Sequence, residues 1–226
     1  MRLKRVVILI LVIAFAFGGC SFKRTLHYTF ENGEEGFVAG IDNVPVDYEK
    51  WGYNIIVTQA EIPNLHSGGL LLSGYNMGDE MFVYAYKNIG KEASLSAGKE
   101  YDITLSFDLA TKMRKEGGDI FGKIPSQSVL VKAGLMNVEP TYEEHEGILK
   151  ANFEIGYYNA DSEFVKALGH IQREGSGDNS MYEYKSFTMQ MTAVPDEKGN
   201  LYVLIGFHSY YIGPTWVFVD NIEIKY

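Results

Sequence analysis

The sequence has one cysteine, Cys20, in 226 residues. A single thiol cannot form a disulfide within the chain, so a disulfide-stapled scaffold is excluded. The fold must therefore rest on a hydrophobic core, and a chain of this length can bury enough apolar surface to supply one.

Familiar catalytic signatures are also missing. The sequence contains no GxSxG nucleophile elbow and no HExxH zinc motif. The histidines are isolated, and the one acidic cluster that includes a histidine, Tyr142–Gly147, has ligands at consecutive positions, which is typical of a solvated loop. A glycosidase needs two carboxylates at a defined separation, and no pair stands out among the 29 acids. We therefore expect no catalytic residues and no enzyme.

Positive charge is scarce. Lysine and arginine total 20 against 29 aspartates and glutamates, for a formal net charge of -9. An acidic surface repels phosphate backbones and anionic headgroups. Nucleic acid is therefore excluded as a main partner, whereas a divalent cation would be tolerated.

The sequence shows no pattern of a long amphipathic helix, no internal repeat and no low-complexity tract. Apolar and polar residues instead alternate with a period of two along most of the chain. Turn-forming residues separate the apolar runs about every ten residues. The expected strands cover residues 26–31, 51–58, 69–73, 80–87, 101–110, 128–133, 149–155, 187–193, 201–208 and 216–224. One helical turn is expected over Val165–Ile171. This pattern predicts an all-β antiparallel sandwich or barrel in a single domain, residues 26–226.

A hydrophobic run occurs only at the start of the chain. Basic residues among the first five precede the apolar segment Val6–Phe17, and two glycines precede Cys20. This arrangement is typical of an export signal and is too short to span a bilayer comfortably. The alternatives are an ordinary secretory signal with an incidental cysteine and a lipoprotein signal.

The small residues directly before Cys20 resemble a bacterial lipoprotein signal, although Phe17 stands where leucine is usual. The resemblance implies that residues 1–19 are removed and that Cys20 is acylated, with palmitate among its lipids. Residues 20–25 would be a lipidated tether. The protein would then be anchored in the bacterial cell envelope on the extracytoplasmic side.

The two ends of the mature chain carry a second resemblance. Phe30, Glu31 and Gly33, followed by Phe37, resemble the opening strand of jelly-roll carbohydrate-binding modules and other galactose-binding-like domains. The closing VFVDNIEI, which contains Asp220, resembles their final strand. The resemblance implies a jelly-roll β-sandwich whose first and last strands lie side by side.

Such modules often bind a structural calcium ion where these strands meet. Glu31 and Asp220 occupy the matching positions, and backbone carbonyls near Asn32 and Gly36 could add ligands. The resemblance thus implies a Ca2+ site at Glu31 and Asp220. Alternatively, Glu31 caps a turn and Asp220 accepts hydrogen bonds from a loop.

Aromatic residues make up 14% of the chain. Trp51, Tyr84 and Tyr86 are the candidates for stacking on a sugar ring, with the loops Thr111–Gln127 and Tyr142–Gly147 as a rim. Alternatively, these rings fill the core or pair across strands. Trp216 is expected to pack against the core.

Taken together, these features predict a lipid-anchored cell-surface module that binds carbohydrate without chemistry. The alternative is a structural or protein-interaction lipoprotein of an envelope complex. A glycoside-acting hydrolase on the same scaffold is the third option and has the least support in the sequence.

Overall fold

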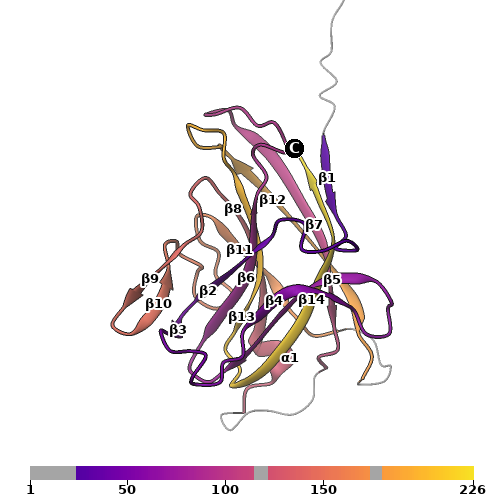
Figure 1. The fold of residues 1–226 in the computed structure, drawn as a ribbon, viewed down its shortest axis with the longest axis vertical. Helices are drawn as coiled ribbons and strands as arrows, with labels where there is room; N and C mark the ends of the chain where they lie inside the picture. The colour runs from indigo at the N-terminus through magenta and orange to yellow at the C-terminus, as the bar shows by residue number, and fades with distance from the viewer. Residues whose placement is uncertain (1–23, 115–121, 174–179) are drawn as a thin grey trace, which may run out of the picture.

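The computed structural model describes residues 24–114, 122–173 and 180–226 (Figure 1). The predicted signal peptide and the lipidation site at Cys20 lie outside these residues. The single-turn α1 (Pro125–Ser128) is the one helix in the described part of the chain. None of the described helical structure is long and apolar enough to cross a bilayer.

The strands form two main sheets and a small third one. Sheet A has the order β12-β7-β14-β5-β4, with β1 added beside β14, and sheet B has the order β11-β8-β13-β6-β2. The strands of sheet A are β1 (Thr25–Tyr28), β4 (Ile56–Glu61), β5 (Gly68–Asn76), β7 (Tyr101–Thr111), β12 (Glu183–Ala193) and β14 (Gly213–Lys225). Those of sheet B are β2 (Val38–Asp42), β6 (Met81–Asn88), β8 (Val129–Met136), β11 (Val165–His170) and β13 (Tyr202–Ser209). The small sheet, β3-β10-β9, joins β3 (Val44–Pro45), β10 (Ile148–Ala151) and β9 (Tyr142–His145) at one side of the molecule.

This strand order is that of a jelly roll. Along the chain, β5, β7, β12 and β14 enter sheet A, while β6, β8, β11 and β13 enter sheet B, and all pairings are antiparallel. Each sheet interleaves early and late strands, as two Greek keys require. The predicted all-β jelly-roll sandwich is therefore confirmed.

The two chain ends are neighbours in sheet A. β1 pairs with β14 in antiparallel register, with Thr25 opposite Lys225 and Tyr28 opposite Ile222. The backbone of Arg24 extends the ladder through hydrogen bonds to Tyr226. The expected pairing of the first and last strands is confirmed.

The main core lies between the sheets and follows the period of two. On β7, Ile103, Leu105 and Phe107 are buried in it, whereas Asp102 and Thr104 lie on the other face. Alternation of this kind is expected of an antiparallel sheet with one solvated face.

Sheet B differs because its outer face is also buried. Phe82 and Tyr84 on β6 form a second apolar cluster with Leu204, and Phe153 and Phe164 from the segment between β10 and β11 cover it. The cover explains why β6, β8 and β13 read as almost continuous apolar runs.

Three sequence expectations are corrected. Residues 165–170 form strand β11, paired with β8 through a bulge near Gly169, and not a helical turn. Residues 142–145 form β9 of a hairpin with β10, and not an irregular loop. The short strands β2 and β3 were not expected at all, because turn-forming residues surround both.

Candidate functional site

A cleft of about 350 Å3 opens on the outer side of sheet B, where the segment after β10 crosses the strands. We call it the outer cleft. Its volume lies within the range of small-molecule sites, ~300–1,000 Å3. Its lining consists of Asp42, Glu80, Lys150, Ala151, Phe153, Glu154, Ile155, Gly156, Tyr157 and His208.

The register of sheet B brings two of these residues together. Asp42 at the end of β2 lies opposite Phe82 on β6, and Phe82 lies opposite His208 on β13. Glu80 immediately precedes β6. Residues far apart in sequence therefore meet at one edge of the outer face.

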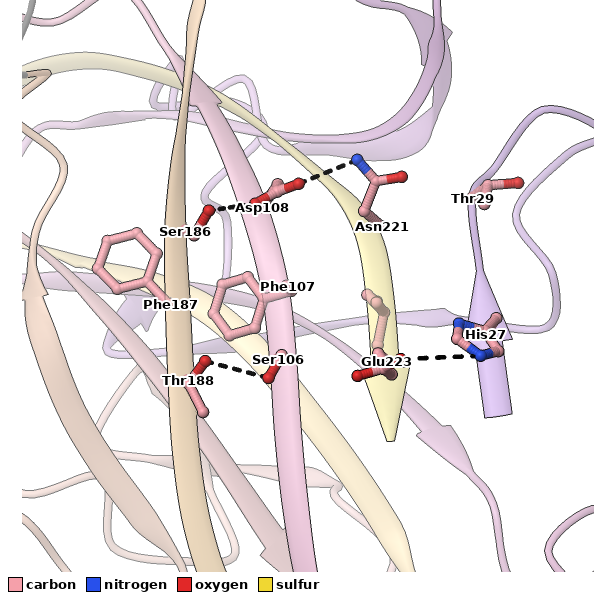
Figure 2. A pocket seen from close by; sticks show the side chains of 11 residues that line it. His27, Thr29, Ser106, Phe107, Asp108, Ser186, Phe187, Thr188, Asn221 and Glu223 are labelled. Atoms are coloured by element: carbon pink, nitrogen blue, oxygen red, sulfur yellow. Dashed lines mark hydrogen bonds and ion pairs between the residues drawn. The ribbon is translucent and has the colours of Figure 1, made fainter. Parts of the chain in front are cut away.

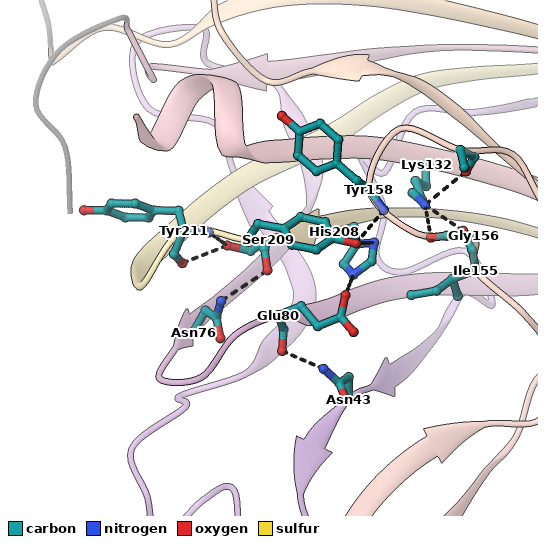
Figure 3. A network of polar contacts seen from close by, with 12 residues as sticks. Asn43, Asn76, Glu80, Lys132, Ile155, Gly156, Tyr158, His208, Ser209 and Tyr211 are labelled. Atoms are coloured by element: carbon teal, nitrogen blue, oxygen red, sulfur yellow. Dashed lines mark hydrogen bonds and ion pairs between the residues drawn. The ribbon is translucent and has the colours of Figure 1, made fainter. Parts of the chain in front are cut away.

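A polar network anchors Glu80 (Figure 3). Its Oε2 lies 3.0 Å from Nε2 of His208, whose Nδ1 lies 3.4 Å from the hydroxyl of Tyr210. The backbone N–H of Tyr158 donates to the Tyr210 hydroxyl at 2.6 Å. These contacts hold the carboxylate in one orientation before any ligand arrives.

The protonation states follow from burial and from this network. His208 is 0% exposed, and burial lowers its pKa. The hydrogen bond from His208 lowers the pKa of Glu80, so the glutamate is ionised at neutral pH. A neutral imidazole with its proton on Nε2 therefore donates to an anionic Glu80.

Asp42 is a second carboxylate in the lining, in a different environment. Burial raises its pKa, while the backbone N–H of Ala151 donates to its Oδ1 at 2.7 Å and opposes the increase. The positive charge of Lys150 acts in the same direction as that hydrogen bond. Lys150 itself donates to Oδ1 of Asn43. The outer cleft thus presents fixed acceptors beside one fixed cation.

Lys132 shapes one wall of the outer cleft. Its side chain is 0% exposed, and its ammonium donates to the carbonyls of Ile155 at 2.7 Å, Gly156 at 2.6 Å and Ala160 at 3.4 Å. Burial lowers the pKa of Lys132 to about 8. This lysine ties residues 155–160 to β8.

The tied segment carries Tyr157, whose side chain is 78% exposed. The ring packs edge-on against Tyr210, with centroids 5.8 Å apart. A ring that is held at one edge and open to solvent can stack on the apolar face of a sugar. The outer cleft therefore combines an aromatic surface with convergent hydrogen-bonding groups.

The predicted ligand-binding rings lie elsewhere. Tyr84 is fully buried in the outer cluster of sheet B, stacked on Phe82, so it cannot stack on a ligand there and this prediction is wrong. Tyr86 is half-buried beside Tyr84, and Trp51 is 65% exposed in the turn before β4. None of the three belongs to the lining of the outer cleft.

Trp216 also departs from expectation. Its side chain is 44% exposed on the outer face of sheet A, and not packed in the core. The ammonium of Lys112 lies 6.0 Å from the centre of its ring. Phe218, the next residue on that face of β14, is the one that is buried.

The predicted calcium ligands come close enough to influence each other. Burial raises the pKa of Asp220, and the charges of Glu31 and Asp108 add smaller increases. Tyr184 donates its hydroxyl to Asp220 Oδ2 at 2.6 Å, and Gly68 donates its N–H to Glu31 Oε1 at 3.1 Å. A cation would relieve this crowding of negative charge.

The donor set, however, is small. Calcium takes ~6–8 oxygens, so backbone carbonyls and water would have to supply most of them. Within residues 24–114, 122–173 and 180–226, no group of three or more histidine, cysteine, aspartate or glutamate side chains is arranged to hold a metal.

The outer face of sheet A offers a second hollow, of about 370 Å3 (Figure 2). Several of its polar side chains are paired with one another: Ser106 with Thr188 at 3.0 Å, and Ser186 donating to Asp108 at 2.6 Å. The aromatic rings in its lining, Phe107 and Phe187, belong to the core between the sheets. The lining of this hollow lacks the exposed aromatic ring that the outer cleft has.

The sequence contained weak signals for the outer cleft. Lys132 interrupts an apolar strand, and His208 ends another. A charged residue in a buried strand needs partners, which points to a polar network. The expected rim contributes no described residue to the lining of the outer cleft. Residues 115–121 of the segment Thr111–Gln127 lie outside the described residues, and Tyr142–His145 form an exposed strand.

No protein-family model matches the chain, and no curated protein matches it. Solved structures do match. The adhesin domain of Lys-gingipain from Porphyromonas gingivalis W83 is 13% identical, with a TM-score of 0.43, and the match covers 89% of this chain and 97% of that one.

Two carbohydrate-binding modules match to a similar extent. The xylan-binding domain CBM22-2 of Paenibacillus barcinonensis Xyn10C is 13% identical, with a TM-score of 0.40, covering 88% of this chain and 97% of its own. The mannan-recognising module TmCBM27 is 11% identical, with a TM-score of 0.43, covering 89% and 98%.

Proposed function

We propose that this protein is a non-catalytic carbohydrate-binding module and that the outer cleft is its binding site. The observation that carries the proposal is the exposed Tyr157 ring beside the convergent polar groups of Asp42, Glu80 and Lys150. A sugar presents an apolar face and a rim of hydroxyls, and this lining matches both.

The geometry gives no support to chemistry at this site. His208 is fully buried, and the carboxylate that it contacts is held ionised, as a fixed hydrogen-bond acceptor requires. A general acid would instead need a raised pKa and an open path to the leaving group. The pKa of Asp42 is raised, but its side chain is buried and its Oδ1 is held by the N–H of Ala151. Binding alone accounts for the arrangement.

The test is a titration of the purified chain with xylo-, manno-, cello- and galacto-oligosaccharides by calorimetry. We expect binding to at least one series, and at least a tenfold loss of affinity in Tyr157→Ala. Trp51→Ala is the matched control, since this exposed ring lies outside the lining, and it should bind like the wild type. Binding that Trp51→Ala abolishes and Tyr157→Ala leaves intact would refute the assignment.

We further propose that the module is held on the bacterial cell surface by a lipid on Cys20, with residues 1–19 removed. The support is the sequence pattern before Cys20. Mass spectrometry of the membrane fraction should find a diacylglycerol- or palmitate-bearing Cys20. In Cys20→Ala the protein should leave the detergent phase; a variant that stays membrane-bound would contradict the anchor.

A structural calcium ion at Glu31 and Asp220 also belongs to the proposal. The carboxylates of Glu31 and Asp108 lie close enough to act on Asp220, which supports it, because a cation bound among them would stabilise their ionised forms. In the wild type, the melting temperature should be higher with 1 mM calcium than with a chelator. In Asp220→Asn, the two melting temperatures should be the same. An equal rise in both proteins would place the ion elsewhere.

A further inference from the structure

The charges of the outer cleft point to one class of carbohydrate, an inference that rests on the proposed function. Asp42, Glu80 and Glu154 contribute carboxylates to the lining, and Lys150 contributes a cation. An ionised carboxylate accepts hydrogen bonds and cannot donate them, so a bound ligand must supply the donors.

Asp42 and Glu80 each have one carboxylate oxygen in contact with a protein group. Asp42 Oδ1 accepts from the N–H of Ala151 at 2.7 Å, and Glu80 Oε2 lies 3.0 Å from Nε2 of His208. The protein thereby fixes both groups. Adjacent hydroxyls on a hexose can donate to acceptors held in this way.

The cations nearby are committed to the protein. Lys150 donates to Asn43, and Lys132 donates to three backbone carbonyls behind the cleft wall. An anionic sugar would therefore meet three carboxylates in the lining, Asp42, Glu80 and Glu154, against the single cation Lys150, which already donates one hydrogen bond to Asn43. The net charge of -9 would also slow the approach of a polyanion.

We propose that the outer cleft takes a neutral hexose residue whose neighbouring hydroxyls donate to Asp42 and Glu80, and that it rejects uronic acids. Glu80 and Asp42 are then the specificity-determining residues. Tyr157 supplies contact that neutral and acidic sugars share, so it contributes affinity and not discrimination.

The test uses matched pairs of monosaccharides at concentrations up to 100 mM: glucose, galactose and mannose against their uronates at pH 7. Binding is followed by NMR shifts of the full chain, purified in detergent. At least one hexose should bind tenfold more tightly than its uronate. Glu80→Gln should bind that hexose more weakly and should reduce the ratio of its affinity for the hexose to its affinity for the uronate. Asp42→Asn is the second variant, for use if Glu80→Gln folds poorly. Glu197→Gln, on the turn before β13, is the control, and its ratio of hexose to uronate affinity should equal that of the wild type.

The outcomes separate the two proposals. If uronates bind as well as the hexoses, and Tyr157→Ala abolishes that binding, the site is a carbohydrate site but the charge selection is wrong. If none of the six sugars shifts the residues of the outer cleft, this inference fails. If the oligosaccharides also fail to bind, the proposed function falls with it.

Discussion

For single residues, burial decides more than residue type whether a side chain can contact a ligand. The period of two correctly places Tyr84 and Tyr86 on one face of β6. Whether that face is open depends on Phe153 and Phe164, which come from a distant segment. No local pattern in the sequence predicts that cover, so the sequence alone presents Tyr84 as a candidate binding residue. Lys132 and His208, which interrupt apolar strands, were the better signals.

Asp42→Asn tests the buried carboxylate. The pKa of Asp42 is raised in the folded state, so the folded protein binds this proton more readily than the unfolded chain. Its ionised form therefore costs stability at neutral pH, and that cost disappears as the pH falls through the raised pKa toward the unfolded value. We expect the variant, which keeps an acceptor for Ala151, to be no less stable than wild type at pH 7.

The stability difference between the two proteins should shrink on acidification to pH 4. Urea denaturation at both pH values measures it. An Asp42→Asn protein that loses ~2 kcal/mol or more at pH 7 would show that the charge stabilises the fold instead.

Gly40→Ala tests how the Tyr84 ring lies on sheet B. A Cβ on Gly40 would lie 2.1 Å from Cε2 of Tyr84, which is far inside van der Waals contact. Because the ring is buried and cannot move away freely, we expect a loss of roughly 1–3 kcal/mol. Gly78→Ala is the control, since its nearest neighbour is the Tyr53 hydroxyl at 3.3 Å. Equal stability of both variants would contradict the packing.

At the scale of elements, regular strands were predictable and irregular ones were not. β7 and β12 have long alternating patterns: β7 matches its expected range to within one residue, whereas β12 begins four residues before its expected start. β11 contains a bulge between Ala167 and Gly169 that interrupts its alternation, which is why its sequence resembles a helical turn. The β9–β10 hairpin turns at Glu146 and Gly147, both with positive φ, where asparagine-glycine would have been the recognisable signal.

Lys132→Met tests the element that carries Tyr157. The change removes the donors to three backbone carbonyls of residues 155–160 and leaves buried acceptors unpaired. We expect a loss of ~1–3 kcal/mol in stability. Hydrogen exchange should also become faster in residues 155–160 than elsewhere. Lys166→Met, which removes a half-exposed ion pair with Asp161, is the matched control and should change neither. Uniform exchange in Lys132→Met would contradict the local role.

At the scale of the whole molecule, the end strands and the spacing of turns indicated the jelly roll, and the pairing of β1 with β14 confirms it. The location of the site did not follow from that fold. It depends on the segment between β10 and β11, which packs on the outer face of sheet B and also lines the outer cleft.

The most direct measurement of the central claim is an NMR map of the isotope-labelled chain titrated with the oligosaccharide that binds best. The account expects the largest shifts at Glu80, Ala151, Gly156, Tyr157 and His208, with Ser106 and Thr188 on the outer face of sheet A unchanged. Shifts confined to sheet A, or to the turn around Trp51, would contradict it.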